Sequence, residues 1–169
     1  MAETITGKIA RKYMGHFLDA SFMGETPSLY RLGKDLEEYN VEMNPNGEQK
    51  QNILGENTYQ LSGYEVSSSA EPYYAVVSDA LFEKLQHIID TQATDDTLKT
   101  YAYEVHLWED GSATGTYKAY RQPCYVVPTS YGGDTSGYQI PFNVNYVGEK
   151  VKLIFTPDGQ GGGTFVADT

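Results

Sequence analysis

Cysteine, tryptophan and basic side chains are scarce in this sequence. The 169 residues include one cysteine, one tryptophan and 12 Lys or Arg against 23 Asp or Glu, which gives a formal net charge of −11. The single cysteine, Cys124, cannot close an intrachain disulfide, and the apolar run 125–127 that follows it predicts a buried thiol. The shortage of basic residues disfavours a protein that holds phosphate backbones through bulk charge.

Long apolar runs are also missing. No stretch approaches the ~18 consecutive apolar residues of a membrane span. Charged side chains interrupt the first eighteen residues at Glu3, Lys8, Arg11 and Lys12. This pattern lacks the apolar segment of a secretory signal peptide. We therefore expect no membrane partner and no export by that route.

Motifs that would indicate catalysis are absent. The three histidines, His16, His87 and His106, stand alone and show no metal-ligand spacing. No serine lies in the glycine pattern of a nucleophile elbow. The glycine-rich stretch 159–164 breaks the dinucleotide-binding pattern and has no P-loop lysine, so we expect a turn there. The sequence predicts neither a metal nor a cofactor, and it gives no positive sign of an enzyme.

What is present is a chain able to build one core. Hydrophobic residues make up 40% of the sequence, and a domain of this size buries roughly 70% of its unfolded surface. We expect a single domain over residues 1–169. Alternating apolar and polar residues predict strands at 29–32, 36–43, 58–67, 101–107, 116–120, 138–146, 151–155 and 165–166.

One helix is predicted at about residues 78–91, with Ser78 as its N-cap. Its apolar residues fall on one face, and they are Leu81, Phe82, Leu85, Ile88 and Ile89. Strands with a single helix predict a mainly-β fold, an antiparallel β-sandwich or barrel with the helix packed against it. Such a fold leaves open edge strands, which tend to pair with other chains.

Two segments are not expected to belong to the core. Residues from about 1 to 22 are weakly patterned and carry Lys8, Arg11 and Lys12, which indicates a basic N-terminal arm. Residues from about 35 to 56 predict a long polar hairpin. Its turn is expected at Asn44-Pro45-Asn46-Gly47, because Asn-Gly tolerates a positive φ. The second arm has almost no apolar residues, so we expect it not to pack on the core of an isolated subunit.

Fifteen tyrosines remain to be explained. About half suit half-buried strands. The others indicate a binding surface, and two kinds of surface fit the sequence. They can be anchors at an interface between protein copies, where tyrosine is enriched. Alternatively, Tyr117, Tyr120, Tyr125 and Tyr131 can form a stacking platform in a β-sandwich that binds carbohydrate or another ligand.

Three stretches of the sequence invite comparison with a known family: Phe17–Ala20 (FLDA), Leu29–Gly33 (LYRLG) and Gly137–Val144 (GYQIPFNV). Together with the order of arm, hairpin, helix and strand-rich C-terminal half, they resemble the major tail protein, or tail-tube protein, of long-tailed bacteriophages and prophages. Tube subunits of contractile injection machines share that fold. The resemblance covers most of the chain and is one of architecture, because the family has no short diagnostic motif.

The resemblance implies a structural virion protein. Subunits of this family join into hexameric rings, and the rings stack into the tail tube through which DNA is ejected. It also implies tape-measure, tail-terminator and baseplate proteins as partners. The expected location is the virion tail, after assembly in the host bacterial cytoplasm.

The resemblance also implies a role for the acidic residues. Carboxylates that line the lumen repel phosphate, so DNA passes without specific binding. The segment 35–56 holds six acids against Lys50. These candidate lumen residues are Asp35, Glu37, Glu38, Glu42, Glu48 and Glu56. A solvated outer face is the alternative interpretation of the same residues. The basic arm is expected to lie on an acidic neighbour, which makes assembly sensitive to salt.

Overall fold

The computed structural model describes residues 5–34, 36 and 38–168, and these residues form a mainly-β fold with one α-helix. This class was predicted and is confirmed. Two short 3₁₀ helices cover Arg11–Tyr13 and Asp95–Leu98. The α-helix is α1 (Ala80–Thr91), and the strands are β1 (Met14–Asp19), β2 (Leu29–Leu32), β3 (Val41–Glu42), β4 (Pro45–Gln51), β5 (Asn57–Tyr64), β6 (Ser67–Ala70), β7 (Lys99–Asp110), β8 (Tyr117–Pro128), β9 (Gly132–Asp134), β10 (Gly137–Gln139), β11 (Phe142–Tyr146), β12 (Val151–Pro157) and β13 (Gly163–Ala167).

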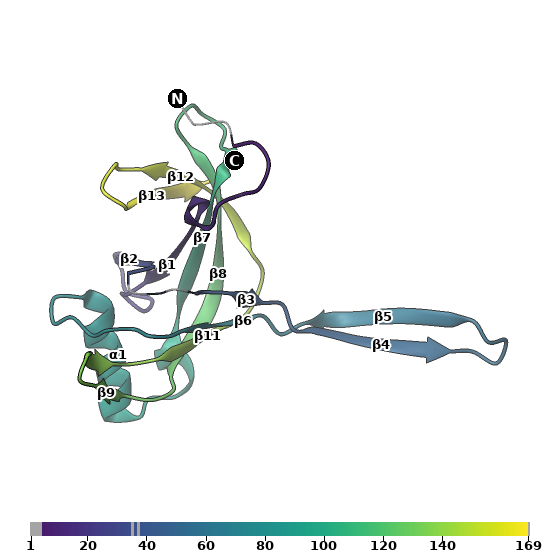
Figure 1. The fold of residues 1–169 in the computed structure, drawn as a ribbon, viewed down its shortest axis with the longest axis horizontal. Helices are drawn as coiled ribbons and strands as arrows, with labels where there is room; N and C mark the ends of the chain where they lie inside the picture. Colours follow the sequence, from purple (N-terminus) through teal and green to yellow (C-terminus); the bar gives the residue numbers. More distant parts are fainter. Residues whose placement is uncertain (1–4, 35, 37, 169) are drawn as a thin grey trace.

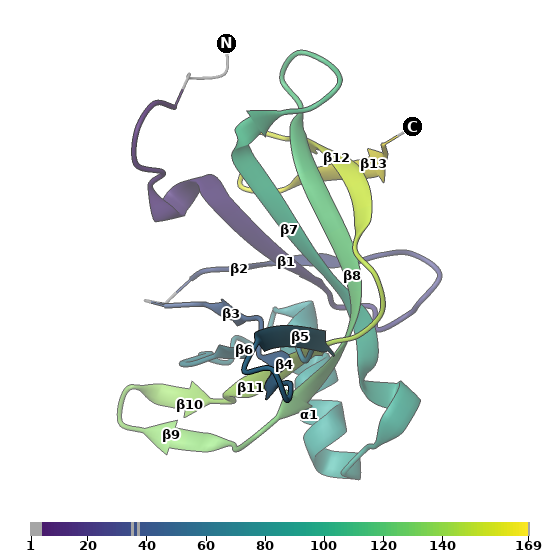
Figure 2. The same cartoon turned by 90° about the vertical axis from the view of Figure 1, so that its right-hand side faces the viewer.

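Nine strands make one antiparallel sheet. Its order is β2-β1-β7-β8-β11-β6-β3, and β12 pairs with both β8 and β13. The sheet curls into a half-barrel, with α1 packed at its lower end (Figures 1 and 2). Two small sheets lie outside it, β9 with β10 and β4 with β5.

The sheet is covered on both faces by two separate cores. One core packs α1 against the sheet and includes Leu18, Leu85 and Phe142. The other lies under β12 and β13 and includes Phe17 and Phe155. Phe17 and Leu18 are neighbours on β1, and successive side chains of a strand point to opposite faces. A single strand therefore supplies both cores.

The predicted N-terminal arm is wrong from Met14 onward. Strand β1 lies between β2 and β7 and is buried along almost its whole length. A strand covered on both faces shows no alternation of apolar and polar residues. Its sequence therefore did not show the period that the other strands display.

The predicted helix is confirmed, with a shift at its start. Helix α1 begins at Ala80, and its N-cap is Asp79 rather than Ser78, without a side-chain capping hydrogen bond. Leu81, Leu85 and Ile88 are buried, as the apolar stripe indicated. The helix ends at Thr91, and its C-cap Gln92 has a left-handed backbone (φ 49°).

The long hairpin exists, but it lies further along the chain than predicted. Strands β4 and β5 are joined at residues 52–56, where the Asn52 side-chain oxygen accepts hydrogen bonds from the N–H groups of Leu54 and Glu56 (2.9 and 3.0 Å). The predicted turn Asn44-Pro45-Asn46-Gly47 instead lies at the hairpin base, and its Asn44 side chain donates to the Glu65 carbonyl (3.0 Å). The register shifts between Asn46 and Gly47. The Asx turn at Asn52 and this bulge explain the displacement.

Three further predicted strands differ in detail. The alternation of 58–67 favours Tyr59 and Leu61 as core residues, yet they are 65% and 42% exposed, because β5 pairs with β4 away from the main sheet. The predicted strand 138–146 divides into β10 and β11 near Pro141, which has no N–H to donate. Of the predicted strand 36–43, only Val41 and Glu42 pair within the described residues.

Candidate functional site: a basic cleft and a projecting hairpin

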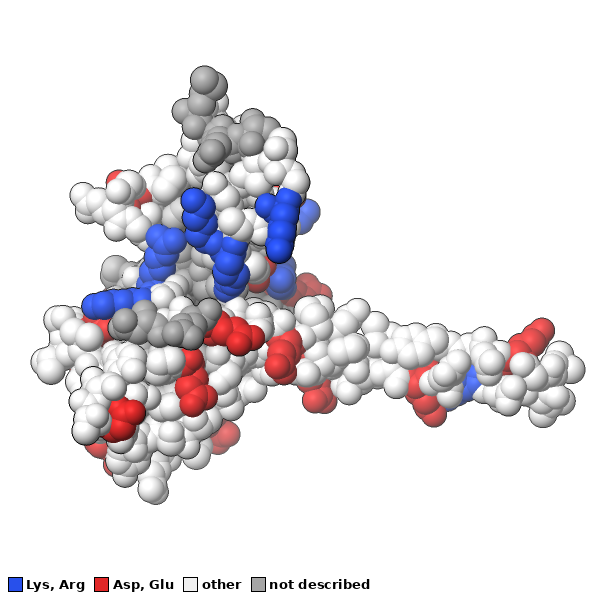
Figure 3. Space-filling model, viewed as in Figure 1, with Lys and Arg blue, Asp and Glu red and all other residues white. Residues whose placement is uncertain are grey.

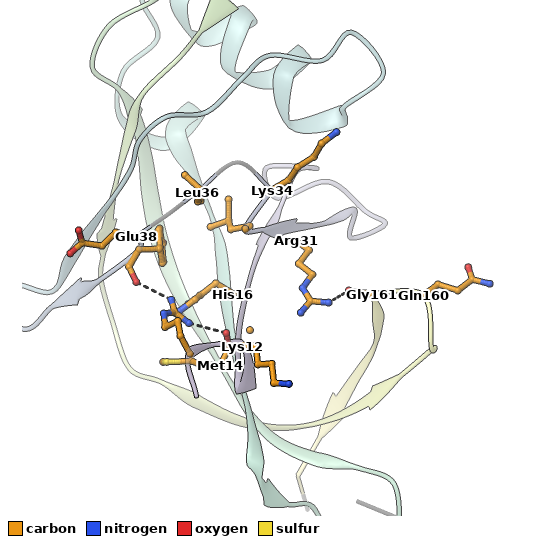
Figure 4. Close-up of a pocket in the computed structure, with 14 residues that line it drawn as sticks. Lys12, Met14, His16, Arg31, Lys34, Leu36, Glu38, Gln160 and Gly161 are labelled. Atoms are coloured by element: carbon orange, nitrogen blue, oxygen red, sulfur yellow. Dashed lines mark hydrogen bonds between the residues drawn. The ribbon is translucent and has the colours of Figure 1, made fainter. Parts of the chain in front are cut away.

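A cleft of about 570 Å³ opens beside β1 and β2 (Figure 4). Arg11 and Lys12 come from the 3₁₀ helix before β1, and Arg31 and Lys34 come from β2 and the residues after it. Glu38 is the one acid among the described lining residues. The rest of the lining is Met14, Gly15, His16, Leu32, Gly33, Leu36, Tyr39, Gln160 and Gly161.

Hydrogen bonds to backbone carbonyls hold the two arginines in place. Arg11 donates to the carbonyls of Met14 (3.0 Å) and Tyr39 (2.9 Å). Arg31 donates to the carbonyl of Gly161 (2.8 Å), which ties β2 to the β12–β13 loop (Figure 4). A guanidinium has five N–H donors. These bonds use two donors of Arg11 and one of Arg31, so both groups are oriented while keeping donor capacity for an anion.

The inner wall of the cleft is buried and uncharged. His16 is 7% exposed, and its ring centroid lies 4.7 Å from that of Tyr39. Burial is the main cause that lowers the pKa of His16 to about 4; Glu104 opposes this shift, and the charge of Arg11 adds to it. His16 is therefore neutral at pH 7. The positive charge of the cleft comes from its four Arg and Lys side chains.

A chain of buried hydroxyls fixes the segment that forms the far wall. The Tyr39 hydroxyl bonds to Ser68 Oγ (2.7 Å) and to the Tyr146 hydroxyl (3.2 Å), which link it to β6 and β11. Burial raises the pKa of both tyrosines, so both stay neutral. The wall is thus held by neutral hydrogen bonds, and Glu38 is the charged side chain that it adds to the cleft.

Charge is segregated over the surface. In Figure 3, Lys and Arg gather on the upper body, while Asp and Glu lie over the lower body and along the hairpin. The four cations of the cleft and Glu38 together carry +3. Subtracting this from −11 leaves −14 for the rest of the chain. The cleft is a positively charged region in a protein whose net charge is negative.

The hairpin projects far from the body (Figure 1). Strands β4 and β5 form a two-stranded sheet of their own, and every residue of β4 is exposed. At the apex, Ile53 is fully exposed and Leu54 is 78% exposed. An isolated two-stranded hairpin is only marginally stable in water. Two large apolar side chains at its tip indicate a surface that binds another molecule.

The structure does not gather the predicted acidic residues into one surface. Asp35 and Glu37 lie outside the described residues. Glu38 and Glu42 line a polar groove of about 500 Å³, together with Glu71, which the sequence analysis missed. Glu48 and Glu56 lie on the hairpin, where Glu48 is 3.6 Å from Lys50 and Glu56 accepts a hydrogen bond from Asn52 (2.7 Å).

The predicted basic residues of the arm lie in different environments. Lys8 is exposed before the sheet begins. Arg11 and Lys12 line the cleft, and Arg11 also donates a hydrogen bond to the Tyr39 carbonyl of its own chain. Arg31 and Lys34 were missed. The pattern of β2 shows Arg31 as the polar residue between Tyr30 and Leu32, but no local signal in the sequence places Arg31 or Lys34 beside Arg11.

The four candidate platform tyrosines do not share one face. Tyr117 packs against the core under β12 and β13. Tyr120 is three residues further along β8, so it points to the opposite face, where its ring lies 5.2 Å from His106. Tyr131 is 65% exposed beside the end of α1. The alternation of β8 separates residues that look clustered in the sequence.

His106 belongs to a network of ion pairs rather than to a metal site. It lies 2.6 Å from Glu104 and 3.2 Å from Glu109, and these acids also pair with Lys150 and Lys118. Throughout the part of the chain that the structure describes, no group of His, Cys, Asp or Glu side chains is arranged to hold a metal ion.

Comparison with known proteins gives no family assignment. No family model matches this chain, and no curated protein matches it significantly. Among the described residues, no helix is long and apolar enough to cross a membrane. The function must therefore be argued from the hairpin, the cleft and the sheet edges.

Proposed function

We propose that this chain is a structural subunit that assembles with copies of itself into stacked rings, as in the tail tube of a long-tailed bacteriophage. The observation that carries the proposal is the projecting hairpin with its exposed apolar apex. A hairpin that packs on no core of its own gains stability when a neighbouring copy covers it, and assembly then offsets the cost of ordering it.

The edges of the sheet support the same proposal. Within the described residues, β2 pairs with β1 only, β3 with β6 only and β13 with β12 only. Unpaired edges tend to pair with other chains, and closing a sheet removes them. Head-to-tail contacts between identical subunits generate rings when the rotation closes. The hexameric state is what the family resemblance implies.

Acidic charge suits a conduit for DNA. The chain outside the basic cleft carries a formal charge of −14, which disfavours binding of phosphate backbones. Glu38, Glu42, Glu48 and Glu56 are the described candidates for the lumen. In this proposal DNA passes without specific binding, and the subunit needs no cofactor and catalyses no reaction.

The remaining parts of the proposal follow from the resemblance alone. The tube would contact tape-measure, tail-terminator and baseplate proteins. It would belong to the virion tail and be assembled in the host bacterial cytoplasm.

Negative-stain electron microscopy of the purified chain at high concentration tests the proposal. We expect rings of constant diameter, and tubes where rings stack. Discrete monomeric particles across a range of salt and protein concentrations would contradict it.

A ligand-binding module is the second candidate, and one observation favours it. Tyr131, 65% exposed, lines a groove of about 320 Å³ together with Ile88, Leu98 and Pro128. An exposed aromatic ring beside a groove can stack on a sugar. Binding on a glycan array that is lost in Tyr131→Ala, by a chain that stays monomeric, would favour this function over assembly.

A further inference from the structure

We propose that the basic cleft of one copy receives the hairpin apex of a second copy. The inference rests on the proposed self-assembly and names the two surfaces that meet. The receiving surface is the cleft lined by Arg11, Lys12, Arg31 and Lys34, and the inserted element is the turn at 52–56.

The two surfaces have complementary shapes. The apex is convex, and Asn52 holds it through hydrogen bonds to Leu54 and Glu56. The cleft is concave, and its volume of about 570 Å³ lies within the ~300–1,000 Å³ of ordinary ligand pockets. A preformed turn loses little conformational freedom when it enters a preformed cleft.

Their chemistry also matches. Ile53 and Leu54 are the two most exposed large apolar side chains at the apex. They would lie against the apolar lining of the cleft, which includes the half-buried Met14 and Leu36. The Glu56 carboxylate, next to the apex, would meet the cationic rim and would therefore not line the lumen. Charge complementarity of this kind fixes the register of a contact and speeds association more than it adds affinity.

The occupant cannot be the hairpin of the same chain. Strands β4 and β5 pair with each other and extend away from the sheet that carries the cleft (Figure 1). A contact between two different surfaces of identical chains is head-to-tail, so each added copy presents a new apex and a new cleft. Docking of this kind propagates an assembly instead of ending at a dimer.

Disulfide crosslinking between two singly substituted proteins tests the contact directly. The native Cys124 is fully buried, and burial raises its pKa to about 12, so it does not compete. One protein carries Leu54→Cys at the apex. The other carries Gln160→Cys, an exposed position that lines the cleft and leaves all four cations intact.

Mixing Leu54→Cys with Gln160→Cys under mild oxidation should give a crosslinked heterodimer in high yield. The matched control is Leu54→Cys mixed with Lys84→Cys, an exposed position on α1, and it should give at least tenfold less product. Equal yields from the two mixtures would overturn the proposed docking.

Charge exchange gives a second, independent readout. Glu56→Lys and Lys34→Glu should each weaken association roughly fivefold, and mixing the two variants should restore it. Glu83→Lys and Lys84→Glu make the same charge changes on exposed residues of α1 and should leave association unchanged. Rings that form in every variant, with no selective crosslink, would overturn the docking and leave self-assembly standing. A wild-type chain that never associates would overturn both.

Discussion

The buried carboxylate of Asp19 fixes the turn that follows β1. Asp19 is 3% exposed, and its Oδ1 accepts hydrogen bonds from the Ser21 N–H (2.9 Å), the Ser21 hydroxyl (2.6 Å) and the Ser28 N–H (3.0 Å). One carboxylate oxygen therefore organises the turn from β1 to β2. Because β2 carries Arg31, this turn also sets one wall of the cleft.

Replacing this carboxylate should destabilise the fold. Asp19→Ala leaves the two backbone donors without their acceptor, and we expect a loss of about 1–3 kcal/mol in the free energy of unfolding, measured by urea denaturation. Asp19→Asn keeps a carbonyl oxygen that can replace Oδ1, so it should cost less. Equal losses in the two variants would contradict this role for the oxygen.

His16 should make stability depend on pH. Its pKa is about 4 in the folded chain and near 6.5 when unfolded, so between these values the unfolded state binds more protons. The free energy of unfolding should fall as the pH drops from about 6.5 to about 4, by up to about 3 kcal/mol from this residue. In urea titrations at pH 7 and pH 4.5, the free energy of unfolding of His16→Gln should fall less than that of the wild-type chain, because the variant lacks this titrating group. An unchanged pH dependence in that variant would contradict it.

Among single residues, the neighbouring sequence predicted burial correctly in some cases. Cys124 was expected to be buried and is, because it stands in an apolar run. Arg31 and Lys34 were missed as cleft residues, because their proximity to Arg11 depends on β1 and β2 pairing. Pairing of strands is a tertiary event that no local pattern of charges reports.

Among the elements, those whose apolar residues recur with a regular period were the ones the sequence predicted. Helix α1 has a single apolar stripe, and β7 and β8 were both expected. Strand β1 was not predicted, because both of its faces are covered and its sequence therefore lacks an alternation of apolar and polar residues. The hairpin was expected, but its turn was misplaced, since two Asn-containing turn signals compete and the one at Asn52 prevails.

Packing of α1 provides a test of the larger core. Leu85 is fully buried against the sheet. Leu85→Ala should lower the free energy of unfolding by about 2–5 kcal/mol, because it removes buried methyl groups and leaves a cavity. Thermal or urea denaturation measures the effect, and Lys84→Ala, on the exposed face of the same helix, is the control. A loss below 1 kcal/mol would contradict the packing of α1 described above.

The hairpin should be dispensable for the fold and required for assembly. Deleting residues 47–62 joins Asn46 to Gly63, which are paired in β4 and β5, and creates an Asn-Gly two-residue turn. The free energy of unfolding of the monomer should change by less than about 1 kcal/mol, because the deleted residues are exposed. A deletion variant that unfolds at far lower urea concentration would show that the hairpin supports its own subunit.

At the scale of the whole molecule, the separation of a basic cleft from an acidic remainder makes association electrostatic. Raising the salt concentration from 0.1 M to 1 M shortens the Debye length from about 10 Å to about 3 Å. We therefore expect ring formation, counted by electron microscopy, to decrease over this range. Assembly that increases with salt would indicate that apolar contacts dominate instead.

Self-assembly through the hairpin is tested most directly by sedimentation velocity of the full chain beside the variant lacking residues 47–62. With increasing concentration, the full chain should shift from monomer to large species of defined size, while the deletion variant should remain a folded monomer. A full chain that stays monomeric at every concentration, or a deletion variant that assembles equally well, would contradict this account of the protein.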